Sequence, residues 1–282
     1  SVTNLSSVQE IANMRTEFEV AQKQTEIDLK QSEVELLNQQ KSNLRILAFR
    51  MITLLGLTGF YFRNIRQAKR RSDDLLLNIL PTKTAEELKE YGKVKAKKFE
   101  SVTVMFTDFQ AFTKYSQNLS PEILVQSVDY FFSKFDDIID AHKLEKIKTI
   151  GDAYMCAGGI PLPHKTHPLD IVKAGLAMQD FINKRKEELA SKGEVGWDLR
   201  VGIHTGPIVA GVGGKWKYAY DIWGNTVNIA SRMESNGEPG RVNISDATYN
   251  IVKEQYKCHH RGKIYAKNVG DIDMYFVEEE IP

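Results

Sequence analysis

Two acidic residues in this sequence each lie beside a short apolar run, where a carboxylate can serve as a metal ligand. Residues 101–109 alternate apolar and polar side chains and carry Asp108 near their end, which is typical of a strand with one buried face. Residues 145–155 have the pattern of a β-hairpin with Gly151-Asp152 at its turn. Taken alone, Asp152 is an ordinary surface residue at the tip of a hairpin.

The spacing of the two aspartates predicts how the chain brings them together. They are 44 positions apart (152 − 108), which accommodates one crossover helix, and we place that helix at residues 121–141. A strand, a helix and then a hairpin would bring both carboxylates to the same edge of one sheet. Two such carboxylates suit a pair of Mg²⁺ ions, which take oxygen ligands and keep coordination places for substrate phosphates.

The C-terminal region continues to alternate between helices and strands. We expect a helix at residues 169–190, a strand at 197–204 and a glycine-rich hairpin at 206–221. Two more helices should follow, one starting near residue 225 and one at 246–256, with further strands in 241–277. This order predicts an α/β fold in which helices pack on a mixed or antiparallel sheet. The glycines of 206–214 do not form a P-loop, because Trp216 follows Lys215 where that motif has Ser or Thr.

The N-terminal region is predicted to be a polar helical stalk. Over residues 1–43, Val20, Ile27 and Val34 recur every seven positions, as in a weak coiled coil. A solvated linker helix is the alternative. Because the chain begins at Ser1 rather than Met, we expect it to belong to a longer protein with an upstream sensor domain.

Residues 44–62 are predicted to be a single transmembrane helix. Only Met51–Phe62 lacks charged residues, and this stretch reaches about 18 Å as a helix, so a span of the ~30 Å bilayer core must include Arg50. An aromatic cluster at 60–62 precedes a basic segment at 63–71, as at the cytoplasmic end of a span. The following domain would then be cytoplasmic. A buried or interfacial helix in a soluble cytoplasmic protein is the alternative.

Residues 63–96 are predicted to be a cytoplasmic signalling helix that joins the membrane helix to the next domain. Pro81 should break this helix. A second, short helix should start at Thr84 and end near Gly92.

Composition excludes two classes of protein. The net charge of +1 gives no global case for nucleic acid as a partner. Cys156 and Cys258 are the two cysteines, which imply no disulfide framework and fit a reducing compartment.

Three motifs resemble, in the same order, those of the class III nucleotidyl cyclases of adenylyl type. They are Phe106-Thr107-Asp108-Phe109, residues 147–154, and residues 220–232, which begin Tyr-Asp-Ile-Trp-Gly-Asn. The resemblance covers residues 97–282. It implies a ferredoxin-like βαββαβ catalytic core with extra strands, which converts ATP to 3′,5′-cyclic AMP and pyrophosphate. It also implies two Mg²⁺ or Mn²⁺ ions at each site.

The resemblance assigns roles to the metal and phosphate residues. Asp108 and Asp152 would bind the two ions, one lowering the pKa of the ribose 3′-hydroxyl and the other offsetting charge on the leaving pyrophosphate. Phe109, Phe112 and Thr113, where the strand turns towards a helix, would bind the substrate, with backbone N–H groups directed at its phosphates.

Two further pairs would recognise the base and stabilise the transition state. Lys148 and Asp221 would read adenine, which has an acceptor at N1 and a donor amino group at N6. Guanine reverses this pattern, and guanylyl members of the family typically carry Glu and Cys at these places. Asn228 and Arg232, four residues apart on one helix face, would orient the ribose and contact the α-phosphate.

The sequence departs from the family near its end. Where the family often has Lys-Gly-Lys-Gly, this chain has Lys267-Asn268-Val269-Gly270. Lys267 would still bind the terminal phosphates, but Val269 replaces the second lysine. Another basic residue of the family corresponds to Lys215 or Lys217.

In this family, the metal aspartates of one site come from one chain, and the base-reading and transition-state residues come from another. Because this chain carries both sets, the resemblance implies a homodimer with two equivalent shared sites. Two alternatives are a guanylyl cyclase and a non-catalytic nucleotide-binding module that relays dimerisation from an upstream sensor.

Overall fold

The computed structural model describes residues 3–110, 112, 120–214 and 217–281. Packing divides the chain into two units, Ser1–Asp74 and Leu75–Pro282, and each unit is described by itself. Thr113 and Lys215 lie outside the described residues. All the other predicted site residues fall in the second unit.

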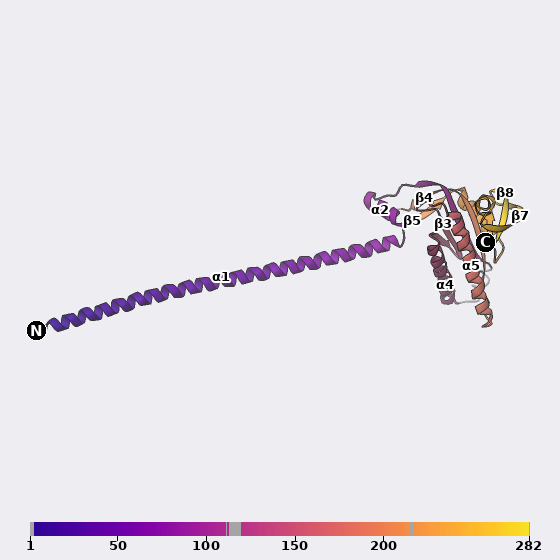
Figure 1. The fold of residues 1–282 in the computed structure, drawn as a ribbon. Coiled ribbons are helices and arrows are strands. Elements are labelled where there is room, and N and C mark those ends of the chain that lie inside the picture. The colour runs from indigo at the N-terminus through magenta and orange to yellow at the C-terminus, as the bar shows by residue number, and fades with distance from the viewer. Residues whose placement is uncertain (1–2, 111, 113–119, 215–216, 282) are drawn as a thin grey trace. The chain divides into compact units, whose positions relative to one another are not determined.

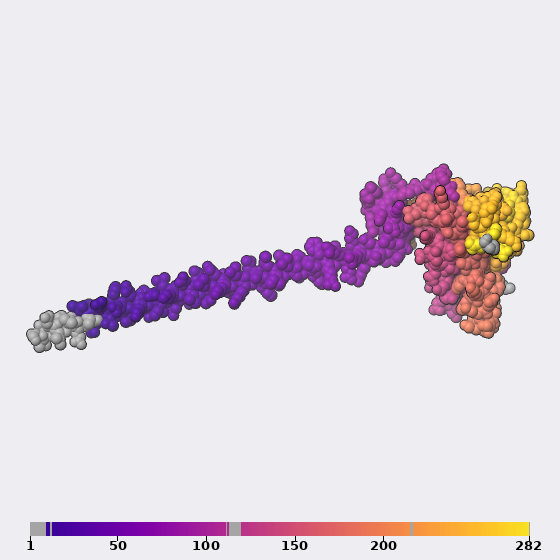
Figure 2. All heavy atoms as spheres, viewed as in Figure 1, coloured from indigo at the N-terminus to yellow at the C-terminus, as the bar shows by residue number. Residues whose placement is uncertain are grey.

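Helix α1 forms the first unit. It spans Thr3–Leu77 without interruption, so the described part of the predicted stalk, the predicted membrane segment and the predicted signalling segment as far as Leu77 are consecutive parts of one helix. Its apolar side chains between residues 44 and 62 are exposed, for example Leu54 at 62% and Phe60 at 65%. Figure 2 shows that the coloured side chains of α1 are exposed on the face drawn. By length and composition alone, the described part of α1 contains a stretch apolar enough to cross a membrane.

A short helix follows α1 after Pro81. It is α2, which spans Thr82–Tyr91 and so starts two residues before the predicted Thr84. Gly92 ends it in the left-handed conformation (φ 68°), which glycine adopts without strain. The predicted break at Pro81 and the predicted end near Gly92 are confirmed.

An eight-stranded sheet forms the centre of the second unit, within the described residues. The strand order is β2-β3-β1-β4-β6-β8-β7, and β5 pairs with a further stretch of β4. All pairs are antiparallel except β4 with β6. The strands span Lys97–Gln110 (β1), Glu145–Ile150 (β2), Ala153–Gly158 (β3), Asp198–Gly213 (β4), Ala219–Trp223 (β5), Val242–Ser245 (β6), Tyr256–Ala266 (β7) and Gly270–Glu280 (β8).

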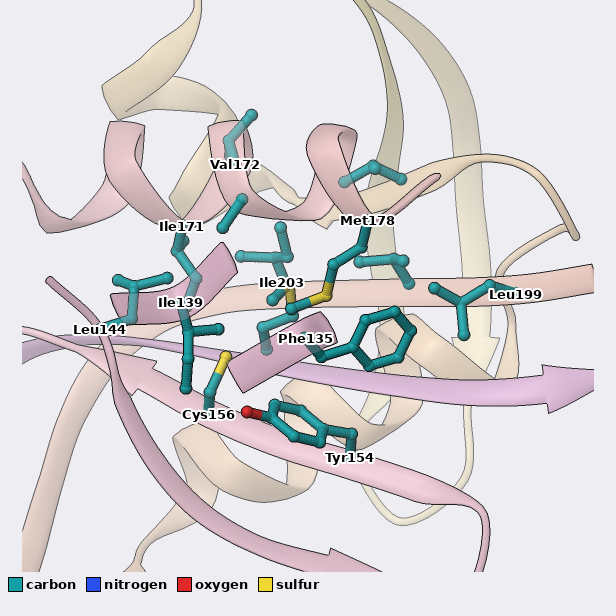
Figure 3. Packing of buried hydrophobic residues seen from close by; sticks show 14 of the residues in the cluster. Phe135, Ile139, Leu144, Tyr154, Cys156, Ile171, Val172, Met178, Leu199 and Ile203 are labelled. Atoms are coloured by element: carbon teal, nitrogen blue, oxygen red, sulfur yellow. The ribbon is translucent and has the colours of Figure 1, made fainter. Parts of the chain in front are cut away.

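Two helices lie side by side on one face of this sheet (Figure 1). α4 spans Pro121–Ala141, as predicted, and α5 spans His167–Ala190. The chain order β1, α4, β2, β3, α5, β4 is the predicted βαββαβ core. Figure 3 shows side chains of both helices packed on those of the strands; the labelled residues include Phe135, Ile139, Ile171, Met178, Tyr154, Cys156, Leu199 and Ile203.

The opposite face of the sheet packs against α6, which spans Asn225–Ser235, and against the turn between α1 and α2. Leu80 and Ala85 are 2% and 1% exposed there, in one cluster with Val104 and Ile222. Since side chains alternate along a strand, the residues of β1 and β4 divide between this face and the α4–α5 face.

Two predicted elements differ from the structure. The strand predicted at 197–204 continues to Gly213 as β4, whose second half pairs with β5, so the glycine-rich hairpin predicted at 206–221 is present and Gly206, Gly211 and Gly213 lie within its first strand. Glycine is a poor strand former, but Gly206 lets α6 approach, because a Cβ there would meet Thr226 Oγ1 at 2.6 Å. The helix predicted at 246–256 is α7, Asp246–Val252, which is shorter because β7 begins at Tyr256.

Gly202→Ala should disrupt the packing of α6 on β4. A Cβ at position 202 would approach the backbone nitrogen of Glu234 to 1.8 Å, and backbone in two packed elements cannot turn aside as a side chain can. We expect the free energy of unfolding to fall by about 3 kcal/mol or more, measured by denaturant titration.

The matched control is Gly213→Ala on the same strand, where a Cβ meets only the Trp223 ring, at 3.8 Å. It should change the free energy of unfolding by less than about 1 kcal/mol. Equal stabilities for the two variants would contradict the close packing at Gly202.

Candidate active site

The structure brings Asp108 and Asp152 together. Asp108 lies near the end of β1 and Asp152 in the turn between β2 and β3, and Thr107 pairs with Tyr154 where these strands meet. The pKa of Asp152 is raised, first by burial and then by the negative charge of Asp108. A cation beside both carboxylates would relieve this repulsion.

Arg200 and Glu234 complete this group, and the sequence analysis did not identify them. Arg200 Nη2 lies 2.6 Å from Asp108 Oδ2, and its Nε lies 2.8 Å from Glu234 Oε1. The second contact is an ion pair without hydrogen-bond alignment, since neither atom has a hydrogen-bond partner. Burial raises the pKa of Glu234 to about 7, although the guanidinium of Arg200 pulls it down.

A partial signal for Arg200 was present in the sequence. Leu199, Val201 and Ile203 alternate as the buried face of a strand, so Arg200 had to face the other side. Its register opposite Asp108 is a product of strand pairing, which local sequence does not encode. Glu234 carried no comparable signal.

Lys148 and Asp221 form a second group. Lys148 Nζ of β2 lies 2.6 Å from Asp221 Oδ2 of β5, and Asp221 Oδ1 accepts a hydrogen bond from its neighbour's N–H, that of Ile222, at 2.9 Å. The two side chains are 41% and 20% exposed, so a ligand can reach them. Together they place a donor and an acceptor side by side.

Asn228 and Arg232 lie on one face of α6, as predicted. Asn228 is exposed, whereas the Nε of Arg232 is buried without a hydrogen-bond partner. Successive helical residues differ by about 100°, so Glu234 points to roughly the opposite side of α6 from Arg232. One helix therefore presents the Asn–Arg pair on one side and touches the metal group on the other.

The base-reading pair is separate from the metal group within one chain. No hydrogen bond or ion pair between described residues joins Lys148 or Asp221 to Asp108 or Asp152. Helix α6 begins directly after β5 and ends against Arg200, and its 11 residues make it about 16 Å long. Asp221 thus lies before the start of α6, whereas Arg200 and Asp108 lie near its end.

The phosphate candidates on β1 contribute to the core. The side chain of Phe109 is 2% exposed and packs on Trp197, with ring centroids 5.1 Å apart. Phe112 packs on the same ring at 5.5 Å. For Phe109, only the backbone is therefore free to face a substrate.

Lys267 and Val269 lie at the turn between β7 and β8. Lys267 is exposed there. Val269 packs against α6 in a cluster with Ile229 and Met233. The residue that departs from the family pattern therefore has a packing role beside the helix that carries Asn228.

The metal pair fits a divalent cation bound together with a nucleotide. Among the described residues, no group of three or more His, Cys, Asp or Glu side chains forms a metal site. Mg²⁺ is usually bound by one or two protein carboxylates, and phosphate oxygens and water fill its other coordination positions. Asp108 and Asp152 would supply two such carboxylates. The acidic surroundings of Arg200 favour a cation in addition.

Comparison with known proteins identifies the family. Residues 94–279 match the adenylate and guanylate cyclase catalytic domain. The chain is 37% identical over 208 residues to an adenylate cyclase of Mycobacterium tuberculosis (strain ATCC 25618 / H37Rv), covering 73% of this chain and 46% of that protein. It is 38% identical over 214 residues to the Homo sapiens guanylate cyclase soluble subunit beta-2, covering 76% of this chain and 34% of that protein. This chain spans less than half the length of these relatives.

A solved structure supports the same assignment. The guanylate cyclase domain of RhGC from Catenaria anguillulae, in complex with GTP, superposes with a TM-score of 0.62 at 32% identity, covering 66% of this chain and 100% of that one. The chain therefore belongs to the class III nucleotidyl cyclases. Its second unit contains a nucleotide cyclase catalytic domain of mixed α/β fold.

Arg200→Met should make the domain depend on divalent cations. The variant leaves Asp108, Asp152 and Glu234 close together without the guanidinium, so the free energy of unfolding should fall by about 3 kcal/mol. A bound cation should restore part of the missing charge. The rise in Tm on adding Mg²⁺ should therefore be larger in the variant than in the parent.

The control for this measurement is Lys184→Met, which removes an exposed ion pair of 2.7 Å with Asp180 on α5. That pair should contribute little, and the Mg²⁺ response should equal that of the parent. If Arg200→Met responds to Mg²⁺ no more than Lys184→Met does, the metal assignment is wrong.

Proposed function

We propose that this domain is an adenylyl cyclase that converts ATP to 3′,5′-cyclic AMP and pyrophosphate. The observation that carries the proposal is the Lys148–Asp221 pair, with its donor and acceptor 2.6 Å apart. Lys148 donates to N1 of adenine, and Asp221 accepts from the N6 amino group. Guanine would set donor against donor and acceptor against acceptor, and each unpaired polar group costs about 1–3 kcal/mol.

The reaction is an in-line attack within one nucleotide. The ribose 3′-oxygen forms a bond to the α-phosphorus, the bond to the bridging oxygen breaks, and the hydroxyl proton is released as pyrophosphate leaves. Two Mg²⁺ or Mn²⁺ ions on Asp108 and Asp152 would lower the pKa of the 3′-hydroxyl and offset charge on the pyrophosphate.

The remaining groups orient the nucleotide. Asn228 holds the ribose, and Arg232 binds the α-phosphate through parallel N–H donors that never lose their charge. The buried Nε of Arg232, which has no hydrogen-bond partner among the described residues, supports this role. The backbone N–H groups predicted at residues 110–113, of which Gln110 and Phe112 are among the described residues, and the exposed Lys267 bind the β- and γ-phosphates.

Each active site is shared between two chains. Within one chain Arg232 points away from the side of α6 that touches the metal group, so the two sets do not converge on one α-phosphate. Reacting groups have to be placed within about 3–3.5 Å of attack geometry. A second copy facing α6 supplies the metal pair, and two-fold symmetry then gives two equivalent sites.

Residues 44–62 of α1 span a membrane, and the catalytic domain lies in the cytoplasm. The exposed apolar side chains of this segment and the basic residues at 63–71 support the assignment. An upstream sensor joined through residues 1–43 would then act on the cyclase through α1. The alternative is a soluble cytoplasmic protein whose α1 packs on another chain.

ATP should be the preferred substrate, and exchange of the base-reading pair should reverse the preference. The double variant Lys148→Glu, Asp221→Cys replaces both the donor and the acceptor that would recognise adenine. The ratio of kcat/KM for ATP over GTP should fall by roughly tenfold or more for each mismatched group. Formation of each cyclic nucleotide with Mg²⁺ and with Mn²⁺ measures this ratio.

Lys146→Glu is the matched control, since Lys146 lies on the same strand but pairs with Asp136 of α4 at 2.8 Å. It should leave the ratio unchanged. Higher kcat/KM for GTP in the parent chain would establish the guanylyl alternative. Nucleotide binding by a stable dimer without any cyclic product would establish the relay module instead.

Mixing two inactive variants should restore activity. Asp108→Ala removes a metal ligand and Asn228→Ala removes a transition-state group, so each homodimer has two defective sites. A mixed dimer has one intact site, and mixing in equal amounts should recover about a quarter of the parent activity, as a statistical consequence of sharing. Specific activity of the parent should also rise with protein concentration. No recovery in a mixture shown to contain mixed dimers would rule out shared sites.

A further inference from the structure

A guanidinium bridge joins the metal pair to α6. Arg200 of β4 lies between Asp108 Oδ2, 2.6 Å from its Nη2, and Glu234 Oε1, 2.8 Å from its Nε. The side chains of Arg200, Asp108 and Glu234 are 25%, 24% and 11% exposed, so solvent screens the bridge only partly. The reaction described above assigns no task to Glu234.

The backbone beneath this bridge allows α6 little independent movement. At Gly202 the C-terminal turn of α6 rests directly on β4, because any Cβ there would meet the nitrogen of Glu234 at 1.8 Å. Asn243 Nδ2 of β6 also donates to the Met233 carbonyl at 2.7 Å. The last turn of α6 is therefore fixed to β4 and β6, and Glu234 meets Arg200 from a rigidly held position.

The same helix carries the Asn228–Arg232 pair on its other side. Arg232 precedes Glu234 by two residues, which is about 200° around an α-helix. The packing of α6 on β4 thus sets both where Glu234 meets Arg200 and, on the other side of the helix, the direction in which Arg232 and Asn228 are presented. Phosphoryl chemistry is sensitive to that direction, since a misplacement of 1 Å can cost about a hundredfold in rate.

We propose that Glu234 is a positioning residue that holds Arg200 between the metal pair and α6, and so couples the metal half of one site to the Asn228–Arg232 half of the other. The coupling rests on the proposed function, in which each chain gives its metal pair to one site and its α6 to the second. A cation bound at Asp108 would compete with Arg200 for that carboxylate, and Arg200 would then be held mainly by Glu234.

Glu234→Gln should weaken metal binding. Without the Glu234 carboxylate, Arg200 pairs with Asp108 alone, and a cation has to displace it from its one remaining acid partner. The dissociation constant for Mn²⁺ should rise by about 10- to 100-fold, as when other residues behind a metal ligand are removed. Electron paramagnetic resonance of free Mn²⁺, with the full chain and 3′-deoxy-ATP, which lacks the attacking hydroxyl, measures this constant without turnover.

The matched control is Glu238→Gln, which removes a nearby carboxylate that is 58% exposed and 3.7 Å from Arg261. It should leave Mn²⁺ binding unchanged. If Glu234→Gln binds Mn²⁺ as Glu238→Gln does, Glu234 does not position Arg200. Should Glu234→Gln fail to fold, Arg200→Lys takes its place, because a lysine keeps the charge but cannot span both carboxylates.

The coupling is tested in a mixed dimer that has one intact site. One chain carries Asp152→Ala, which leaves the Asp108–Arg200–Glu234 bridge in place, and the other carries Asn228→Ala. The intact site then takes its α6 from the Asp152→Ala chain and its metal pair from the Asn228→Ala chain. Glu234→Gln is added to either chain in turn.

In the chain that supplies α6, Glu234→Gln should lower kcat by about tenfold or more while the Mn²⁺ affinity of the intact site stays constant. In the chain that supplies the metal pair, it should raise the Mn²⁺ dissociation constant. An unchanged kcat in the first arrangement would overturn the coupling. An inactive parent mixture would remove the shared site and the coupling with it, while the Mn²⁺ titration of the unmixed variant would still decide whether Glu234 positions Arg200.

Discussion

The antiparallel pairing of β1 with β4 sets the positions of Asp108 and Arg200. It runs from Lys97 opposite Ala210 to Gln110 opposite Asp198, with one irregularity near Phe99. Because side chains alternate, this register places Asp108 and Arg200 on the α6 face and sends Phe109 into the aromatic core. A slip of one residue would bury the carboxylate and expose the phenyl ring, so the core that stabilises the fold also specifies the site.

Helix α6 separates two groups of candidate site residues. Gly202 permits direct contact between the helix and β4, which holds the helix axis close to the strand. One side of a helix packed in this way contacts Arg200, which pairs with Asp108, and another side faces away from the sheet. In the proposed reaction the groups on these two sides of α6 act on the same phosphate, and the association of two copies is what would bring them together.

Five charged residues of the candidate site are paired with one another. Arg200 contacts Asp108 and Glu234, and Lys148 contacts Asp221, all with moderate exposure. Paired charges avoid the cost of isolated buried ions. Substrate and cations then exchange one set of ionic contacts for another, so binding needs no creation of new charge in a dry environment.

Local sequence determined the elements and the residues within a single element. The spacing of Asp108 and Asp152 called for a crossover helix, placed at residues 121–141, which is α4. Gly151-Asp152 identified the hairpin turn, and four-residue spacing placed Asn228 and Arg232 on one helix face. The motif resemblance named Lys148 and Asp221 as a pair, although nothing in their spacing predicts contact.

Tertiary structure alone decided which residues from different strands and helices face one another. Arg200 and Glu234 are 34 positions apart (234 − 200) and meet only because α6 packs on β4 at Gly202. The extension of β4 through its glycines, and the meeting of β2 with β5 that joins Lys148 to Asp221, likewise depend on strand pairing. Hydrophobic and turn patterns act over a few residues, whereas register and helix seating result from the packing of the whole sheet, and the charged residues around Arg200 are positioned by that packing.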